Sequence, residues 1–148
     1  MKRLRNYFVM LTVAIMALFC TSCGGGDDSE ELGSFVEYTE ADTFYETYTS
    51  YTGSKALIDT REKSKFVAGH LPGAVNMPAD IYNTADDNAQ WSQDLLAAYP
   101  TNTCLFFYGT TSFQMTKTVA GRASKLGYGK VNSRIFSKGY DELKTVWK

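Results

Sequence analysis

The chain has 148 residues, of which 44% are hydrophobic and 21% are charged. This length suits one domain of ordinary size and is too short for two domains with cores of their own. The formal net charge of -1 provides no basic surface for nucleic acid, and the composition excludes a wholly disordered chain. Three cysteines, Cys20, Cys23 and Cys104, are too few for a disulfide framework and match no zinc-binding spacing.

The first residues are organised like an export signal. Lys2, Arg3 and Arg5 are followed by Tyr7–Phe19, a run of 13 mostly apolar residues without charge. This run has the length of a signal-peptide core and is shorter than the roughly 20 apolar residues that a membrane-spanning helix needs. We therefore expect the segment to direct export and to be removed afterwards.

The end of this segment, Cys20–Cys23, has the sequence Cys-Thr-Ser-Cys and resembles the signal of bacterial lipoproteins. In such signals small residues precede a cysteine that is diacylated and becomes the new N-terminus. Cys23 is the better lipidation candidate because two bulky residues precede Cys20. The resemblance implies a signal peptide over 1–22 and a protein held by its lipid on a membrane of the bacterial cell envelope. Display on the outer membrane, toward the periplasm or on the cell surface all stay open.

Residues 23–34 have the composition of a flexible, acidic tether. Glycines and then a run of like charges follow the lipidated cysteine, and neither can build a core. An acidic run at this place also resembles the surface-export signal of some Bacteroidetes-type lipoproteins. We expect the folded domain to span 35–148.

The first half of this domain alternates helical and strand patterns. Thr39–Asp42 has the spacing of a capping box, and three aromatic residues then recur at helical spacing. These features predict a helix over about 40–50 with an aromatic face in the core, carried by Phe44, Tyr48 and Tyr51. The elements expected next are a strand at 56–58, a short helix over 62–67, a strand at 74–77, a polar surface excursion at 80–88 and a helix through 91–99.

The second half begins with the strongest strand pattern of the chain, Cys104–Tyr108. The elements expected after it are a polar turn at 109–114, a helix over 115–126 with Gly127 as its C-cap, a strand at 131–136 and a helix over 140–147. Strands that alternate with helices predict an α/β fold whose parallel sheet is covered on both faces.

Two segments, Ala56–Glu62 and Phe66–Pro78, carry a long and position-specific pattern. A strand ends in Asp-x-Arg-Glu, and Gly-His-x-Pro-Gly-Ala-x-Asn-x-Pro follows. In this pattern the sequence resembles a rhodanese-like domain, and the resemblance covers roughly 35–148. It implies a three-layer α/β fold with a five-stranded parallel sheet flanked by helices. It also implies a structural role for the charged and turn-forming residues of the pattern, which are Asp59, Arg61, His70, Pro72 and Gly73.

In active members of this family the loop after the Cys104–Tyr108 strand begins with a cysteine that carries a persulfide. The chemistry needs a thiolate there because only sulfur can attack a sulfane donor and then hold the transferred atom. The matching position in this sequence is Gly109, and the loop after it contains no cysteine, arginine or lysine. We therefore interpret the domain as a binding or interaction module without sulfurtransferase activity, without a catalytic residue and without a cofactor. Its partner would be an unidentified protein or a small anion.

Two alternatives stay open. The first is sulfur transfer from thiosulfate or a persulfide through Cys104, although five extended residues place Cys104 about 16 Å from position 109, at roughly 3.3 Å per residue. The second is a receptor for an oxyanion or small ligand, in which backbone N–H groups and hydroxyls of the loop bind the ligand. The residues of this loop are Gly109, Thr110, Thr111, Ser112, Phe113 and Gln114. A metal site has no matching pattern, because His70 is the single histidine and no acidic spacing resembles a calcium loop.

Overall fold

The computed structural model of the chain describes residues 33–79, 85–110 and 114–148, with the backbone alone at 85–88. The chain divides into two units, Met1–Glu30 and Glu31–Lys148, and the described residues all belong to the second unit. Within the described ranges, no helix has the length and apolar character needed to cross a bilayer.

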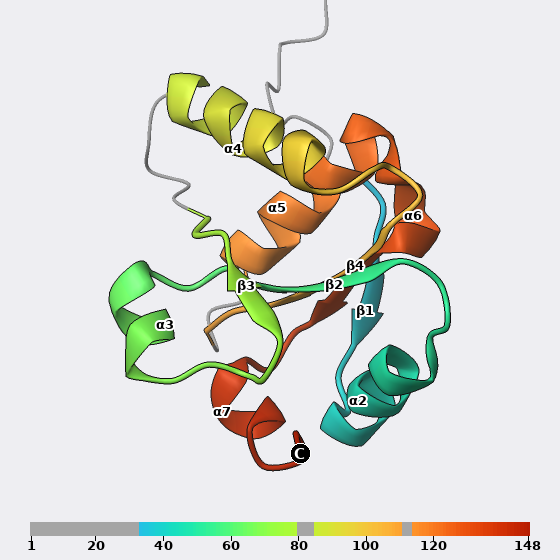
Figure 1. Ribbon diagram of the computed structural model, residues 1–148, viewed down its shortest axis with the longest axis vertical. Coiled ribbons are helices and arrows are strands. Elements are labelled where there is room, and N and C mark those ends of the chain that lie inside the picture. The colour runs from blue at the N-terminus through green and yellow to red at the C-terminus, as the bar shows by residue number, and fades with distance from the viewer. Residues whose placement is uncertain (1–32, 80–84, 111–113) are drawn as a thin grey trace, which may run out of the picture. The chain divides into compact units, whose positions relative to one another are not determined.

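Five parallel strands form a single sheet in the order β1-β5-β4-β2-β3 (Figure 1). The strands are β1 (Val36–Tyr38), β2 (Lys55–Asp59), β3 (Ala74–Asn76), β4 (Cys104–Tyr108) and β5 (Ser133–Phe136). All five residues of the central strand β4 are buried, as expected for a parallel strand with helices on both faces. The three-layer α/β architecture implied by the sequence is confirmed.

Helices cover both faces of this sheet (Figure 1). One layer holds α4 (Ala85–Ala98) and α5 (Gln114–Ala123), and α5 continues through a π-helical turn, Ser124–Tyr128, into α6 (Gly129–Asn132). The other layer holds α2 (Ala41–Ser50) and α7 (Tyr140–Leu143). The short helix α3 (Lys63–Ala68) joins β2 to β3 and lies beside that edge of the sheet.

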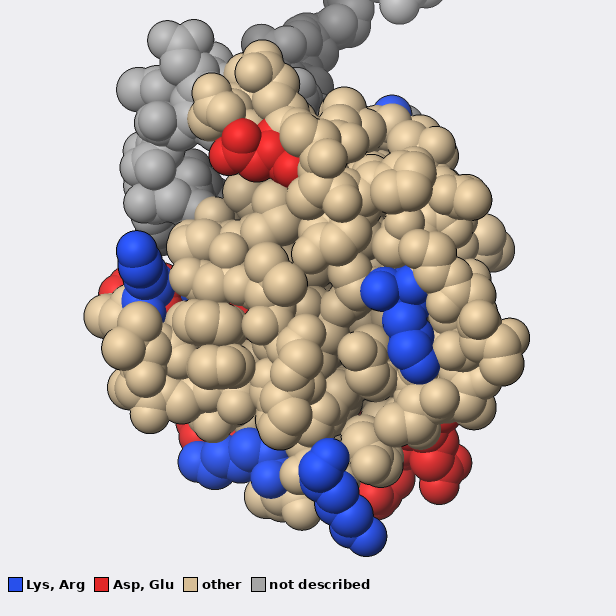
Figure 2. All heavy atoms as spheres, viewed as in Figure 1, with Lys and Arg blue, Asp and Glu red and all other residues tan. Residues whose placement is uncertain are grey.

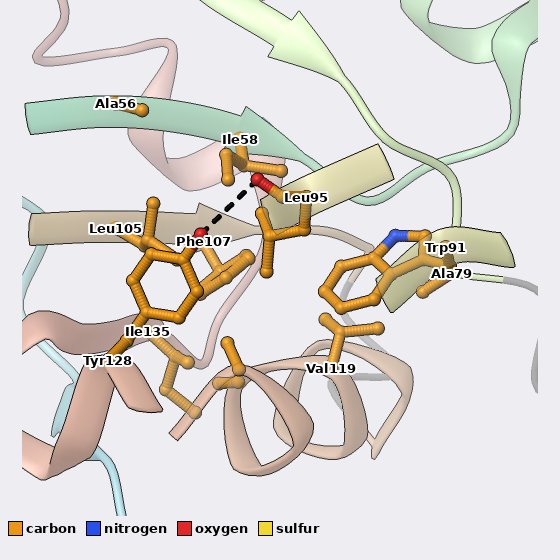
Figure 3. Close-up of a cluster of buried hydrophobic side chains, with 12 residues drawn as sticks. Ala56, Ile58, Ala79, Trp91, Leu95, Leu105, Phe107, Val119, Tyr128 and Ile135 are labelled. Carbon is orange, nitrogen blue, oxygen red and sulfur yellow. Dashed lines mark hydrogen bonds between the residues drawn. The ribbon is translucent and has the colours of Figure 1, made fainter. Parts of the chain in front are cut away.

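The core under α4 and α5 fixes the position of both helices (Figure 3). Leu95 of α4 and Val119 of α5 are at most 1% exposed and pack in one cluster with Phe107 of β4. The Tyr128 hydroxyl donates to the carbonyl oxygens of Leu95, at 3.2 Å, and Tyr99, at 2.6 Å. Full burial of each such apolar side chain contributes roughly 1.5–3 kcal/mol, so this cluster holds α4 and α5 firmly against the sheet.

The core on the opposite face is largely aromatic. Phe44 of α2 is fully buried, and its ring centroid lies 5.6 Å from those of Phe106 and Phe136. Tyr48 and Tyr51 pack against the same cluster. The predicted aromatic face of this helix therefore belongs to the core, where each such ring pair adds about 0.5–1.5 kcal/mol.

Three features in the first part of the domain differ from the expected elements. The helix α2 begins at Ala41 with Glu40 as its N-cap and no side-chain capping bond, because Thr39 lies one residue too early for a capping box. The strand β1 was not predicted, since its three residues are too few to show a pattern. Helix α4 begins at Ala85, so the end of the expected excursion at 80–88 is helical, and 80–84 lies outside the described residues.

The last elements also differ in their limits. Gly127 has φ +109 and breaks the helical geometry, as a C-cap does. The chain then forms α6 where a strand from 131 was expected, because Val131 is 66% exposed and pairing with β4 begins only at Ser133. The last helix ends at Leu143, short of the expected 147, and turns follow it.

Candidate functional site

The carboxyl ends of β2 and β4 lie side by side and define the candidate site. Asp59, the last residue of β2, is in register with Tyr108, the last residue of β4. Thr60 continues from β2, and both its N–H, at 2.9 Å, and its hydroxyl, at 3.0 Å, donate to the Tyr108 carbonyl oxygen. Ligands of open α/β sheets bind beyond the carboxyl ends of the strands, so Gly109 begins the loop at the place where a ligand would lie.

Asp59 and Arg61 form a buried ion pair at this edge. Arg61 Nη2 lies 2.6 Å from Asp59 Oδ2, and Nε lies 3.0 and 3.1 Å from the two carboxylate oxygens. Burial alone would lower the pKa of Arg61, but the hydrogen bond and the charge of Asp59 raise it, so the guanidinium stays protonated. Nη2 also donates to the Gly69 carbonyl oxygen at 2.7 Å, and the guanidinium carbon lies 3.8 Å from the Tyr140 ring centroid. The pair thus connects the end of β2 to α3 and α7 by charge-assisted contacts.

The other residues of the motif shape the turn between α3 and β3. His70 Nδ1 lies 3.0 Å from the Phe66 carbonyl oxygen, and the two rings stack at 3.9 Å between centroids. Gly73, after Pro72, has φ +82, a conformation that favours glycine. Two cavities, described below, open at the ends of β2 and β4, and His70 lines neither of them.

Two threonine hydroxyls occupy the space beside Gly109. The Oγ1 atoms of Thr60 and Thr116 lie 3.1 Å apart and form a hydrogen bond, here called the threonine bridge. Thr60 is 4% exposed and Thr116 is 1% exposed. A Cβ atom on residue 109 would lie 2.3 Å from Thr116 Oγ1 and 2.7 Å from Thr60 Oγ1. The threonine bridge therefore fills the place that a side chain at position 109 would need.

Two cavities open at this edge of the sheet and share Arg61, Lys65 and Thr110 in their walls. The first cavity has a volume of about 240 Å³, and the described residues that line it also include Glu62, the threonine bridge and three apolar side chains, which are Pro78, Ala79 and Met115. The second has a volume of about 200 Å³, and the other described residues in its wall are Lys138, Tyr140 and Asp141. The apolar side chains of the first cavity and the polar side chains of the second thus lie on either side of Thr110, which lines both cavities.

The structure places only part of the predicted anion-binding loop. Gly109 directly follows the last residue of β4, Thr110 lines both cavities, and Gln114 is exposed at the start of α5. Thr111, Ser112 and Phe113 lie outside the described residues. The loop sequence itself carries no cation, but α3 contributes Lys65 and the turn after β5 contributes Lys138. Sequence reasoning missed both lysines, because only the fold brings these two segments to the loop.

Cys104 lies at the other end of β4 from Gly109. Its side chain is fully buried, and its Sγ atom lies 3.9 Å from the Val131 carbonyl oxygen. Burial raises the pKa of this thiol, and the nearby Arg134 and Tyr51 offset that rise only in part. Cys23, the predicted lipidation site, lies outside the described residues. Within the described ranges no three His, Cys, Asp or Glu side chains are grouped to hold a metal ion.

A third cavity, of about 420 Å³, lies between β3 and α4 and has a different character. Val75, Met77 and Trp91 contribute to its wall, and Asp94 brings the single charged side chain among the described residues that line it. The face shown in Figure 2 consists mostly of uncharged residues, with the charged side chains chiefly toward its periphery. Among the described residues that line this third cavity there is no lysine or arginine, in contrast to the first two cavities.

The comparisons with known proteins agree with the fold. The family model for the Rhodanese-like domain matches residues 41–145. Similar solved structures include a protein from Anabaena sp., with 15% identity over 73% of this chain and 86% of that chain and a TM-score of 0.56. An uncharacterized protein from Saccharomyces cerevisiae has 18% identity over 76% of this chain and 92% of that one, with a TM-score of 0.56. A protein from Staphylococcus saprophyticus subsp. saprophyticus has 17% identity over 74% of this chain and 92% of that one, with a TM-score of 0.52. No curated protein matches the chain.

Proposed function

Because the chain belongs to the rhodanese-like domain family, we propose that it is a rhodanese-like lipoprotein of the bacterial cell envelope without sulfurtransferase activity. It acts as a binding or interaction module, held on a membrane by a lipid on Cys23. Gly109 then stands where active members of the family have the cysteine that carries sulfur. The signal peptide over 1–22 and the lipid anchor are supported by the sequence pattern alone.

The threonine bridge is the observation that carries this proposal. Sulfur transfer needs a thiolate that attacks the sulfane sulfur of thiosulfate, releases sulfite and then passes the sulfur to an acceptor such as cyanide. Position 109 has no side chain, and the two hydroxyls take up the space in which one would lie. Among the described residues, these hydroxyls bond to each other and the Thr60 hydroxyl also donates to the Tyr108 carbonyl oxygen, so no base is in contact to activate them.

A receptor for an oxyanion or another small ligand is the second candidate function. Its support is the position of Lys65 and Lys138 beside Arg61 in the cavity walls. Each cation has an acidic neighbour, since Arg61 pairs with Asp59, Lys65 Nζ lies 4.0 Å from Glu62 Oε1 and Lys138 Nζ lies 3.4 Å from Glu142 Oε1. We therefore expect a modest affinity for inorganic oxyanions.

Sulfur transfer through Cys104 has less support than either function. The thiol is buried at the opposite end of β4 and its pKa is raised, so the thiolate form is disfavoured. A change of loop register at Gly109 would not bring the start of this strand to the cavities, because β4 is paired with β2 and β5 along its length.

The test is the formation of thiocyanate from thiosulfate and cyanide by the full chain, with an active rhodanese assayed in parallel. We expect no thiocyanate above the protein-free reaction. Turnover that persists in Cys104→Ser would contradict the proposal by showing another nucleophile. Turnover that disappears in Cys104→Ser would also contradict it and would assign the sulfur-carrying role to Cys104.

A further inference from the structure

We propose that the third cavity, between β3 and α4, binds a small organic cation, an amine with a short apolar body. The ammonium group lies against Asp94, and the apolar body lies against Val75, Met77 and Trp91. Among the described residues that line it, this cavity has only Pro78 in common with the two cavities at the ends of β2 and β4. The inference therefore goes beyond the proposed function and does not depend on whether the domain transfers sulfur.

The charge around this cavity favours a cation. Asp94 is the single charged residue among the described residues of the wall, and it forms no ion pair with any residue that the structure describes. The guanidinium carbon of Arg122 lies 5.7 Å from the Trp91 ring centroid, but Arg122 does not line the cavity. Both β3 and α4 belong to the stretch 66–116, which contains four aspartates and no glutamate, lysine or arginine. At low salt a cation is therefore attracted to this cavity and an anion is repelled.

The carboxamides and the carboxylate of the wall offer acceptor oxygens. Asn76 Nδ2 donates to the carbonyl oxygens of Asp59, at 3.1 Å, and Arg61, at 2.8 Å. Gln90 Nε2 donates to Asp94 Oδ1 at 2.7 Å. In the part of the chain that the structure describes, Asn76 Oδ1, Gln90 Oε1 and Asp94 Oδ2 have no hydrogen-bond partner. An ammonium group has three donors and no acceptor, so it matches these oxygens better than an acid group does.

The apolar part of the wall favours an organic body on the cation. Trp91 is 9% exposed, and the buried cluster with Ala79 and Val119 fixes its position (Figure 3). Its Nε1–H donates to the Met77 carbonyl oxygen at 3.5 Å. Val75, on the edge strand β3, is 45% exposed and adds apolar surface. The volume of about 420 Å³ lies within the range of small-molecule sites, roughly 300–1,000 Å³, which are mostly apolar with a few polar groups.

The experiment is isothermal titration of the full chain at low salt with five small ligands. Benzylamine and butylamine carry an ammonium group and an apolar body, methylamine lacks the apolar body, benzyl alcohol lacks the charge, and benzoate reverses it. We expect benzylamine to bind about two- to fivefold more tightly than benzyl alcohol, as for one exposed ion pair. Butylamine should bind more tightly than methylamine, by up to about fourfold for each methylene that the cavity buries. Benzoate should not bind.

Substitutions connect this selectivity to the cavity. Asp94→Asn keeps an acceptor for Gln90 and removes the charge, so it should weaken benzylamine about two- to fivefold and leave benzyl alcohol unchanged. Glu46→Gln is the matched control for the lost charge, because Glu46 is exposed on α2 and lines none of the three cavities described above. Val75→Thr replaces an exposed methyl group by a hydroxyl and should weaken both ligands by up to about fourfold. Unchanged unfolding curves verify that these variants are folded.

Tryptophan fluorescence locates the bound amine. The chain has two tryptophans, so Trp147→Phe leaves Trp91 as the single one. Trp147 packs against Phe44 and Tyr48 in the core on the opposite face of the sheet. We expect benzylamine to change the Trp91 emission of this variant over the same concentration range as the heat of binding. Saturable binding without that change would place the amine elsewhere.

Four outcomes would overturn this inference: no binding of benzylamine, equal affinity for benzylamine and benzyl alcohol, equal effects of Glu46→Gln and Asp94→Asn, or binding without a change in Trp91 emission. None of them bears on sulfur transfer, because thiocyanate formation measures the proposed function separately. A chain that forms no thiocyanate and binds no amine would refute the ligand and leave the inactive-module proposal standing. A chain that forms thiocyanate would refute that proposal whatever it binds.

Discussion

Replacement of Gly109 by alanine should destabilise the domain although the backbone conformation admits a side chain. The new Cβ would meet Thr116 Oγ1 at 2.3 Å and Thr60 Oγ1 at 2.7 Å, both on buried, β-branched side chains. Overpacking of this kind costs about 1–3 kcal/mol, and loss of the hydrogen bond between the hydroxyls adds about 0.5–1.5 kcal/mol. We therefore expect Gly109→Ala to lower the free energy of unfolding by about 2–4 kcal/mol in urea denaturation.

A double-mutant cycle separates this clash from other effects of the substitution. Thr116→Ala removes the nearer hydroxyl, so Gly109→Ala should cost at least about 1 kcal/mol less in that background than in the wild-type chain. Thr118→Ala on the same helix is the matched control, because the exposed Thr118 hydroxyl donates to the Gln114 carbonyl oxygen and to no other residue that the structure describes. A cost below about 0.5 kcal/mol, within the range of ordinary surface substitutions, or equal costs in the two backgrounds, would refute the reasoning.

Three further predictions concern the ion pair, the pH dependence and the buried thiol. Asp59→Asn should lower the free energy of unfolding by about 3–5 kcal/mol, because it leaves the Arg61 charge buried without its partner. Urea denaturation measures this loss, and a loss under about 1 kcal/mol would contradict a tight buried pair. Burial raises the pKa of Cys104 and of Tyr108, so the folded chain holds these protons more tightly than the unfolded chain does. The free energy of unfolding should therefore fall as the pH rises past the ordinary pKa values of a thiol and a phenol, about 8.5 and 10. Tyr108→Phe should make this fall shallower, and an unchanged slope of the unfolding free energy against pH would count against a buried phenol. Cys104 should react with a maleimide only after unfolding, and rapid labelling in native buffer would show that the thiol is accessible.

The strands and the motif could be predicted because their signals are local. Cys104–Tyr108 is a continuous apolar run with turn residues on both sides, and such a run fits a strand buried on both faces. Asp59 and Arg61 are two residues apart in the sequence, so their ion pair could be predicted from that spacing. The strand β1 was missed because its three residues become a strand only through pairing with β5.

The polar features of the site could not be predicted because they join segments that are distant in the sequence. Thr60 and Thr116 lie 56 residues apart, and no periodicity relates them. Lys65 follows β2 and Lys138 follows β5, and their common position at Thr110 depends on the order of the strands. Sequence reasoning therefore predicted a loop without the nucleophile, while the occupied space beside Gly109 and the lysines beside Thr110 became evident only from the fold.

Intact-mass measurement of the full chain after exposure to thiosulfate tests most directly whether this domain has lost the ability to carry sulfur. A persulfide adds the mass of one sulfur atom to the cysteine that holds it, and peptide mapping locates that cysteine. With Gly109 at the head of the loop and Cys104 fully buried, we expect the folded domain to keep its unmodified mass. A stable adduct of one sulfur atom on the folded domain would contradict a role without sulfur transfer.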